Sequence, residues 1–296
     1  MNAFRFSAII FILLSFGKCL AAQEPDSSSA LKSMIEAERA FARRAVTHGV
    51  RDAFVENLSD EAIIFRPGPV KGKPVWQERK PLALMIRWEP EYVDIAASGD
   101  FGYSTGPAEY LGVKPLTPAI GYGYFISIWT KQPDGKWKVA LDIGTEAPKL
   151  EHTDIKIHFP FGADVKKIFA QISTETEKTS LIGFDEKFNK TYTKNRTVEF
   201  FLKNVAPGAR FYREGKFPVS QIDSIKLLVL QMADIFWQPI DGAVALSGDM
   251  GYTYGSYKIQ SEDKPEEGYY FRAWKRENME QWKIVIDVLS PVPPQK

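Results

Sequence analysis

The feature that most constrains this 296-residue chain is a motif that occurs twice. The segment Trp88–Gly106 contains a Trp-x-Pro step followed by a Ser-Gly-Asp-x-Gly-Tyr run, and both recur 149 residues later in Trp237–Gly255. Before this block the spacing is 147 residues, as from Phe41 to Phe188, and after it the spacing is 145 residues. Such small shifts belong in surface loops, so the repeat predicts one fold used in tandem.

The first 22 residues have the features of a cleaved secretory leader. Arg5 gives a positive start, residues 7–16 form a short apolar run, and Leu20–Ala22 supplies small residues before the cleavage point. The run is shorter than the ~18 residues that a membrane span needs, so no stable span is expected. We predict a signal peptide at 1–22 and a secreted or periplasmic protein, with Cys19, the only cysteine, removed with the leader.

Composition limits the class of partner. The formal net charge is +1, and 44% hydrophobic with 25% charged residues is ordinary for a globular protein. Nucleic acid is therefore not an expected partner. We predict a first domain at 30–146, a linker at 147–163 and a second, diverged domain at 164–290.

The periodicity of apolar residues predicts an α+β fold, with helices before strands in each half. Helices are expected at 31–46 and 52–57, and strands at 62–66, 92–97, 102–111, 121–130 and 137–143. Ser98-Gly99-Asp100 and its copy are expected to form a turn, with glycine at a positive φ and aspartate capping the bend.

The motifs of the first half also resemble a known superfamily. Phe65-Arg66-Pro67-Gly68, Trp88-Glu89-Pro90, the Ser98–Gly106 run and Asp134–Lys138 resemble a bacterial group of SnoaL-like, nuclear-transport-factor-2-like (cystatin-like) domains that has no assigned function. The second half matches more loosely. The resemblance implies two tandem cone-shaped α+β rolls, each with N-terminal helices packed in a curved antiparallel sheet and a pocket at the open end.

The superfamily includes ketosteroid isomerase, cyclases, dehydratases and non-catalytic modules, so the resemblance leaves enzyme and binding protein both open. In the isomerase the catalytic base is an aspartate directly before a proline. By its position before Pro67, the matching residue here is Arg66, and the repeat places Arg213 there. A guanidinium stays protonated in proteins, so an isomerase mechanism with that base is disfavoured.

Two matched pairs of charged residues are candidates for a site. Arg66 and Arg213 are expected either to bind an anion at the pocket mouth or to form ion pairs that hold a loop. Strict strand alternation would place Trp137, Val139, Leu141 and Ile143 on one face and Asp142 on the other with Lys138 and Ala140. This favours an exposed carboxylate, or one at a contact between the halves, for Asp142 and its copy Asp287. The alternative is an acid inside the pocket.

Aromatic residues that repeat in register are expected in the core or in a pocket wall. The candidates for a ligand-binding pocket are Arg66, Trp88, Tyr103, Tyr124, Asp142, Arg213, Trp237 and Tyr252. Large side chains such as Phe217, Phe236 and Tyr254 are candidates to fill the second pocket.

Three functions remain open from the sequence. The first is a binding module for a small, partly apolar ligand with a polar or anionic end. The second is an enzyme of the cyclase, dehydratase or isomerase type, in which Tyr103 or Asp142 transfers a proton, and the third is a scaffold in which the two repeats contact each other as a pseudo-dimer. The three histidines have no metal-ligand spacing, so no metal and no cofactor is expected.

Overall fold

The computed structural model describes residues 27–112, 118–151, 155–159, 173–232, 234–260, 265–277 and 280–293. The expected signal peptide and part of the expected linker lie outside these residues. Among the described helices, none is long and apolar enough to cross a membrane.

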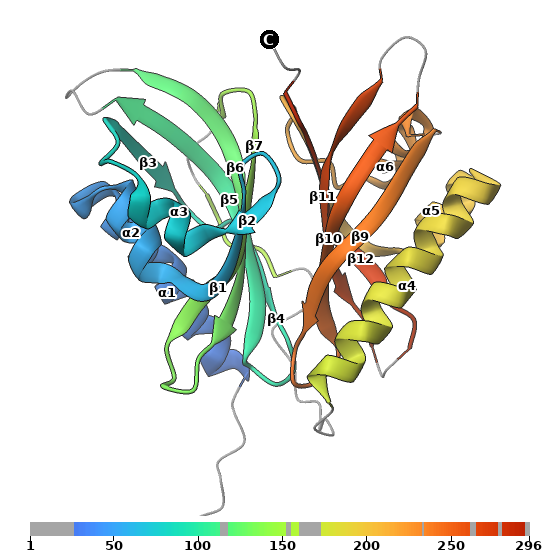
Figure 1. Cartoon of the computed structure of the whole chain (residues 1–296), viewed down its shortest axis with the longest axis horizontal. Coiled ribbons are helices and arrows are strands. Elements are labelled where there is room, and N and C mark those ends of the chain that lie inside the picture. The colour runs from blue at the N-terminus through green and yellow to red at the C-terminus, as the bar shows by residue number, and fades with distance from the viewer. Residues whose placement is uncertain are drawn as a thin grey trace, which may run out of the picture.

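The first domain is a curved sheet that wraps around helices (Figure 1). Its elements are α1 (Ser27–His48), α2 (Val50–Asn57), β1 (Leu58–Phe65), β2 (Pro69–Lys71), α3 (Gly72–Glu78), β3 (Leu84–Trp88), β4 (Tyr92–Ile95), β5 (Phe101–Gly112), β6 (Ala119–Lys131) and β7 (Trp137–Glu146). The strand order is β2-β1-β7-β6-β5-β3, with β4 also paired to β5. All pairs are antiparallel except β1 with β7.

The second domain repeats this plan with fewer elements. They are α4 (Thr174–Asn195), α5 (Val198–Lys203), β8 (Val205–Arg213), α6 (Ile222–Gln231), β9 (Ile235–Val244), β10 (Met250–Ile259), β11 (Glu266–Lys275) and β12 (Lys283–Pro291). The strand order is β8-β12-β11-β10-β9, and β8 is again parallel to β12. The predicted α+β class and the tandem organisation are thus confirmed.

Local sequence explains the start of each domain. Apolar residues at three- and four-residue spacing give α1 one buried stripe, and Gly49, with φ of 93°, separates it from α2. α4 has the same length as α1, 22 residues, and begins 147 positions later. The expected turn is also observed, because Gly99 and Gly248 have φ of 66° and 68°. The short elements β2, β3 and α3 were not predicted.

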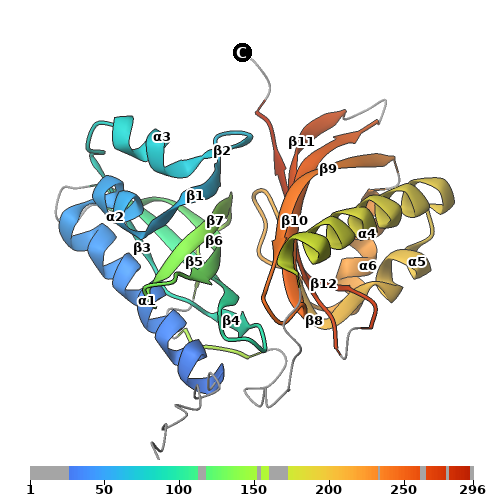
Figure 2. The ribbon, with the colours of Figure 1, turned by 60° about the horizontal axis from the view of Figure 1, so that its bottom comes forward.

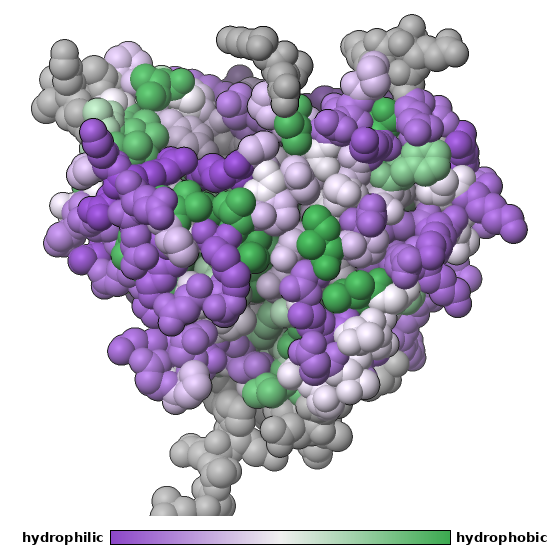
Figure 3. Space-filling view, viewed as in Figure 1, coloured by the Kyte–Doolittle hydropathy of each residue, from purple (hydrophilic) through white to green (hydrophobic). Residues whose placement is uncertain are grey.

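The two sheets pack back to back, with the helices on the outer sides of the molecule (Figures 1 and 2). One apolar cluster contains residues of both sheets, including Phe101 and Tyr252, whose rings stack with centroids 6.1 Å apart. Each domain also has its own core between sheet and helices. Seen from one side, the surface is mostly polar, with apolar residues gathered in the middle, where the domains meet (Figure 3).

Polar contacts fix the register between the sheets. Thr105 and Tyr212 join their hydroxyl groups at 2.9 Å, and Arg210 contacts Glu91 at 3.3 Å. Lys275 forms an ion pair with Asp94, which is buried. The predicted contact between the repeats is therefore observed, and it is a pseudo-dimer made within one chain.

A bulge in β7 determines which way its side chains face. Trp129 of β6 pairs with Val139 and Ile128 pairs with Leu141, so Ala140 is the extra residue. Val139 therefore faces the helices while Leu141 faces the second domain. Asp142 follows Leu141 and points to the helix side. The uninterrupted alternation assumed from the sequence was wrong, and β12 has a matching bulge between Ile284 and Ile286.

Candidate ligand-binding site in the first domain

The first domain contains a cavity of about 1070 Å³ between its helices and the inner face of its sheet. Its walls are largely apolar, from α1, α2 and strands β3, β5 and β6, and include Phe41, Phe54, Ile86, Trp88 and Phe125. Phe41 packs edge-on against both Phe54 and Trp88, with 4.9 Å between ring centroids in each case. Interlocked aromatic walls of this kind form a rigid cavity suited to a small, partly apolar molecule.

Asp142 is one of three carboxylates that line this cavity, with Glu146 and Glu214. Its Oδ2 accepts a hydrogen bond from the Ser127 hydroxyl at 3.0 Å, and the two residues are direct partners in the β6–β7 pair. Burial raises the pKa of Asp142 to about 6, while the Ser127 bond and the positive charge of Arg66 hold it down. At neutral pH this side chain is therefore mostly ionised, and protonation needs only a small change in its surroundings.

A second acid, Glu38 of α1, lies beneath the cavity and has no exposed surface. Its carboxyl oxygens accept hydrogen bonds from the indole groups of Trp88 at 2.6 Å and Trp129 at 2.8 Å, and from the Ser104 hydroxyl. Burial raises its pKa to about 7, against the effect of these three donors. Glu38 thus fixes the orientation of Trp88, which forms part of the cavity wall.

The rim of the cavity carries charges of both signs. Arg66 and Arg79 lie there with Glu146, and the second domain contributes Glu214 and residues 290–293. The backbone N–H of Glu146 donates to the Glu214 carboxylate at 3.1 Å, which ties the two domains together at the mouth. The second domain therefore completes the opening of the first domain's pocket.

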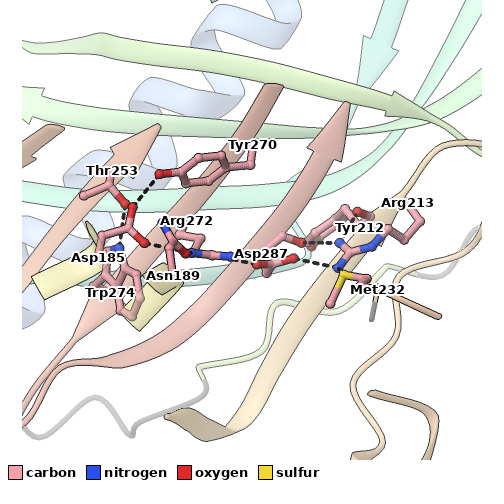
Figure 4. Close-up of polar contacts among 10 residues, drawn as sticks. All are labelled: Asp185, Asn189, Tyr212, Arg213, Met232, Thr253, Tyr270, Arg272, Trp274 and Asp287. Atoms are coloured by element: carbon pink, nitrogen blue, oxygen red, sulfur yellow. Dashed lines mark hydrogen bonds and ion pairs between the residues drawn. The ribbon is translucent and has the colours of Figure 1, made fainter. Parts of the chain in front are cut away.

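In the second domain an arginine fills the corresponding position. Arg272 stands at the repeat equivalent of Ser127, pairs with Asp287 as Ser127 pairs with Asp142, and has no exposed surface. Its guanidinium group contacts Asp185 at 2.7 Å, Asn189 at 2.6 Å and, through Nε, Asp287 at 2.9 Å (Figure 4). Asp185 is the repeat equivalent of Glu38.

Aromatic rings surround the same guanidinium group. The Arg272 Cζ lies 5.0 Å from the ring centroid of Phe188, 4.7 Å from that of Trp237 and 4.9 Å from that of Tyr270. A second arginine, Arg213, contacts the other oxygen of Asp287 at 2.7 Å. The interior of the second domain is thus occupied by its own side chains, and Arg213 forms the structural ion pair that was one of the two sequence-based alternatives.

The structure divides the eight predicted pocket residues into three groups. Arg66, Trp88, Tyr124 and Asp142 line the first-domain cavity. Arg213 and Trp237 surround Arg272 and Asp287 in the second domain. Tyr103 and Tyr252 lie in the apolar cluster between the two sheets and are not among the residues that line the cavity.

The residues expected to fill the second pocket do not do so. Phe217 and Phe236 are exposed, and Tyr254 belongs to the contact between the sheets. The residue that fills it, Arg272, was missed, as was Glu38. Both carried a signal, because Glu38 interrupts the apolar stripe of α1, and aligning the repeats places an arginine opposite a serine. Among the described residues, no cluster of three or more His, Cys, Asp or Glu side chains is arranged to hold a metal.

Comparisons with known proteins describe the fold only. No family model and no curated protein matches the chain. A protein of unknown function with a cystatin-like fold from Nostoc punctiforme PCC 73102 is 13% identical over 40% of this chain and 92% of its own, with a TM-score of 0.33. An NTF2-like protein with a cystatin-like fold from Novosphingobium aromaticivorans is 12% identical over 43% and 85%, with a TM-score of 0.34. An NTF2-like protein of unknown function from Shewanella oneidensis MR-1 is 9% identical over 38% and 97%, with a TM-score of 0.31.

Proposed function

We propose that this is an exported binding protein that holds a small, partly apolar molecule with a polar end in the cavity of its first domain. The observation that carries the proposal is the contrast between the two repeats. Position 127 is a serine beside an open cavity, while the equivalent position 272 is an arginine that fills the space. The second domain then acts as a scaffold that buries the outer face of the first sheet and supplies part of the rim.

The chemistry of the cavity supports the same conclusion. Apolar aromatic walls provide most of the contact area, and Asp142 with Ser127 provides a localised polar group that orients a ligand. Because Glu214 and residues 290–293 of the second domain border the opening, ligand entry depends on both domains. Export is proposed from the leader sequence, and N-terminal sequencing of the mature protein tests it.

Native mass spectrometry of the protein purified from its own compartment tests the binding function. The expected result is a bound small molecule in the wild type and in Ser127→Ala, and its loss in Ser127→Arg, which copies the filled second domain. Thermal unfolding of the two variants identifies a folding defect. A second variant, Ala108→Trp, places a large side chain in the cavity wall and so blocks the cavity without adding a charge. An empty wild-type protein, or a ligand retained in both blocking variants, contradicts the proposal.

One observation favours a catalytic alternative. Asp142 has a pKa of about 6 in a largely apolar cavity and is hydrogen-bonded to a hydroxyl group, which suits a group that accepts and returns a proton. If the molecule found by mass spectrometry is converted by the wild type and not by Asp142→Asn, the protein is an enzyme. Binding without conversion in both forms supports the binding protein.

A further inference from the structure

We propose that the floor of the first-domain cavity binds the cationic end of the ligand, a guanidinium, amidinium or ammonium group, between aromatic rings and the carboxylate of Asp142. This inference deepens the proposed function and rests on it. It assigns a positive charge to the polar end of the ligand, whereas Arg66 suggested an anionic end from the sequence.

The second domain shows what this scaffold holds at the equivalent place. There the guanidinium group of Arg272 lies within 5.0 Å of the ring centroids of Phe188, Trp237 and Tyr270, and its Nε contacts Asp287. Arginine over aromatic faces and beside a carboxylate is a favourable cation environment.

The first domain keeps the three rings and one of the two carboxylates and lacks the cation, while Glu38, the equivalent of Asp185, is bonded to Trp88, Trp129 and Ser104 instead. The repeat equivalents of the three rings and of the carboxylate are Phe41, Trp88, Phe125 and Asp142, and all four line the cavity. Ser127 is the repeat equivalent of Arg272, and its side chain is too short to place a group among the three rings. A ligand cation would therefore complete in the first domain the arrangement that Arg272 completes in the second.

The charges around Asp142 also favour a cationic ligand group. In the second domain Asp287 contacts two arginines, Arg213 and Arg272. Among the described residues, no cation lies within ion-pair distance of Asp142, whose hydrogen-bond donor is Ser127. A mostly ionised carboxylate in an apolar cavity gains from a cation that shares its low-dielectric surroundings.

Arg66 does not supply this cation. It is the equivalent of Arg213 and makes the same bond to the preceding backbone carbonyl, here that of Phe65 at 2.7 Å, but it is exposed at the rim. Arg79 lies at the same rim, over the ring of Trp76. The rim therefore carries charges of both signs, while Asp142, beside Ser127, is the acid next to the aromatic rings that match those around Arg272, so a cation gains most there.

Isothermal titration calorimetry with three small probes tests the inference on the full chain. The probes are phenylguanidine, its neutral counterpart phenylurea, and benzoate. We expect wild type to bind phenylguanidine at least about tenfold more tightly than phenylurea, and benzoate more weakly than either. Asp142→Asn should lose the preference for phenylguanidine and still bind phenylurea as wild type does. Ser127→Arg should bind neither.

Asp60→Asn is the matched control, because it makes the same change as Asp142→Asn at an exposed position of β1 that does not line the cavity. It should retain the preference for phenylguanidine. If phenylurea or benzoate binds wild type as tightly as phenylguanidine, or if Asp142→Asn retains the preference, the cation assignment is overturned while a binding pocket stands. If none of the probes binds, the cation assignment is also overturned, and the proposed function is then decided by the native mass spectra.

Discussion

Ser98 and Ser247 meet across the boundary between the two domains and bond to each other reciprocally. The backbone N–H of Ser98 donates to the Ser247 hydroxyl oxygen at 3.1 Å, the N–H of Ser247 donates to the Ser98 hydroxyl oxygen at 3.2 Å, and the two hydroxyl oxygens lie 2.9 Å apart. The aspartates of the two turns continue the symmetry, since Asp249 accepts from Ala97 and Asp100 accepts from Leu246. The repeated Ser-Gly-Asp motif is thus an element of the interface between the domains.

Replacing either serine with alanine should destabilise the protein by a similar amount, about 1–3 kcal/mol, because it leaves the other serine's buried N–H without its acceptor. Chemical denaturation of Ser98→Ala, Ser247→Ala and the double variant measures this. The double variant should cost less than the sum of the two single variants, since both remove parts of one network. Thr179→Ala, at an exposed helical site, is the control and should have little effect. Additive losses would contradict a shared network.

Removing Arg272 should have a much larger effect. Arg272→Met leaves Asp185 and Asp287 without the guanidinium that joins them, and breaking a buried ion pair costs about 3–5 kcal/mol. The equivalent change in the first domain, Ser127→Ala, removes one hydrogen bond and should cost about 1 kcal/mol. Denaturant unfolding at pH 7 compares the two variants.

Arg272→Met combined with Asp185→Asn should lose less stability than Arg272→Met alone, because the amide leaves no uncompensated buried charge at position 185. If Arg272→Met is unfolded at pH 7, recovery of structure in the variant that also carries Asp185→Asn, followed by circular dichroism, still tests the same cause. Equal destabilisation by Arg272→Met and Ser127→Ala would show that the arginine is not essential to the second core.

Tyr103 should tolerate the loss of its hydroxyl group. It is fully buried in the contact between the sheets, and its hydroxyl has no hydrogen-bond partner among the described residues. Tyr103→Phe should leave stability unchanged or raise it by up to about 1 kcal/mol, and ligand binding should be unaffected. Tyr212→Phe is the matched control and should cost about 1 kcal/mol, because the Tyr212 hydroxyl bonds to Thr105. A loss of ligand binding in Tyr103→Phe would reopen its catalytic role.

The tandem organisation and the α+β class could be predicted because they depend on long-range repetition and on apolar periodicity. The side of the sheet on which Asp142 lies could not be predicted. The extra residue Ala140 reverses the alternation of side chains after it, and no residue type in the strand signals such a bulge. Arg66 and Trp88 were placed at the pocket because their neighbours carry the resemblance. Tyr103 and Tyr252 were placed there too, because aromatic residues look alike in a pocket wall and in an interface.

Glu38 and Arg272 could have been found by comparing the repeats position by position. A carboxylate within an apolar helical stripe must be buried with partners. In the second repeat the partner of Asp185 is Arg272, at the position where the first repeat has Ser127. Aromatic residues that repeat in register indicate shared packing, whereas Ser127 and Arg272 are matched positions of different charge inside the two domains. At that position Arg272 occupies the interior of the second domain, and Ser127 lies beside the cavity of the first.

Because of Glu38, the free energy of unfolding should fall as the pH rises from about 4.5 to about 7. The pKa of Glu38 is raised from an ordinary value of 4.5 to about 7, so the folded chain holds a proton that the unfolded chain releases in this range. The stabilisation is complete below about pH 4.5 and is lost as the pH approaches 7, by an amount of about 3 kcal/mol. Asp142, with a pKa of about 6, contributes in the same direction at lower pH.

Glu38→Gln separates the two acids, because a neutral amide has no charge to bury. Its single oxygen can accept from Trp88 or from Trp129 but not from both, since the two indole groups bond to different carboxyl oxygens. Its free energy of unfolding should be nearly level between pH 6 and 7, where wild type still loses stability, so the advantage of wild type at low pH should shrink as the pH rises. Urea denaturation at half-unit pH steps measures the difference between the two proteins. Parallel curves would mean that Glu38 is ionised in the folded protein throughout this range, and that Trp88 is then oriented by a buried charge.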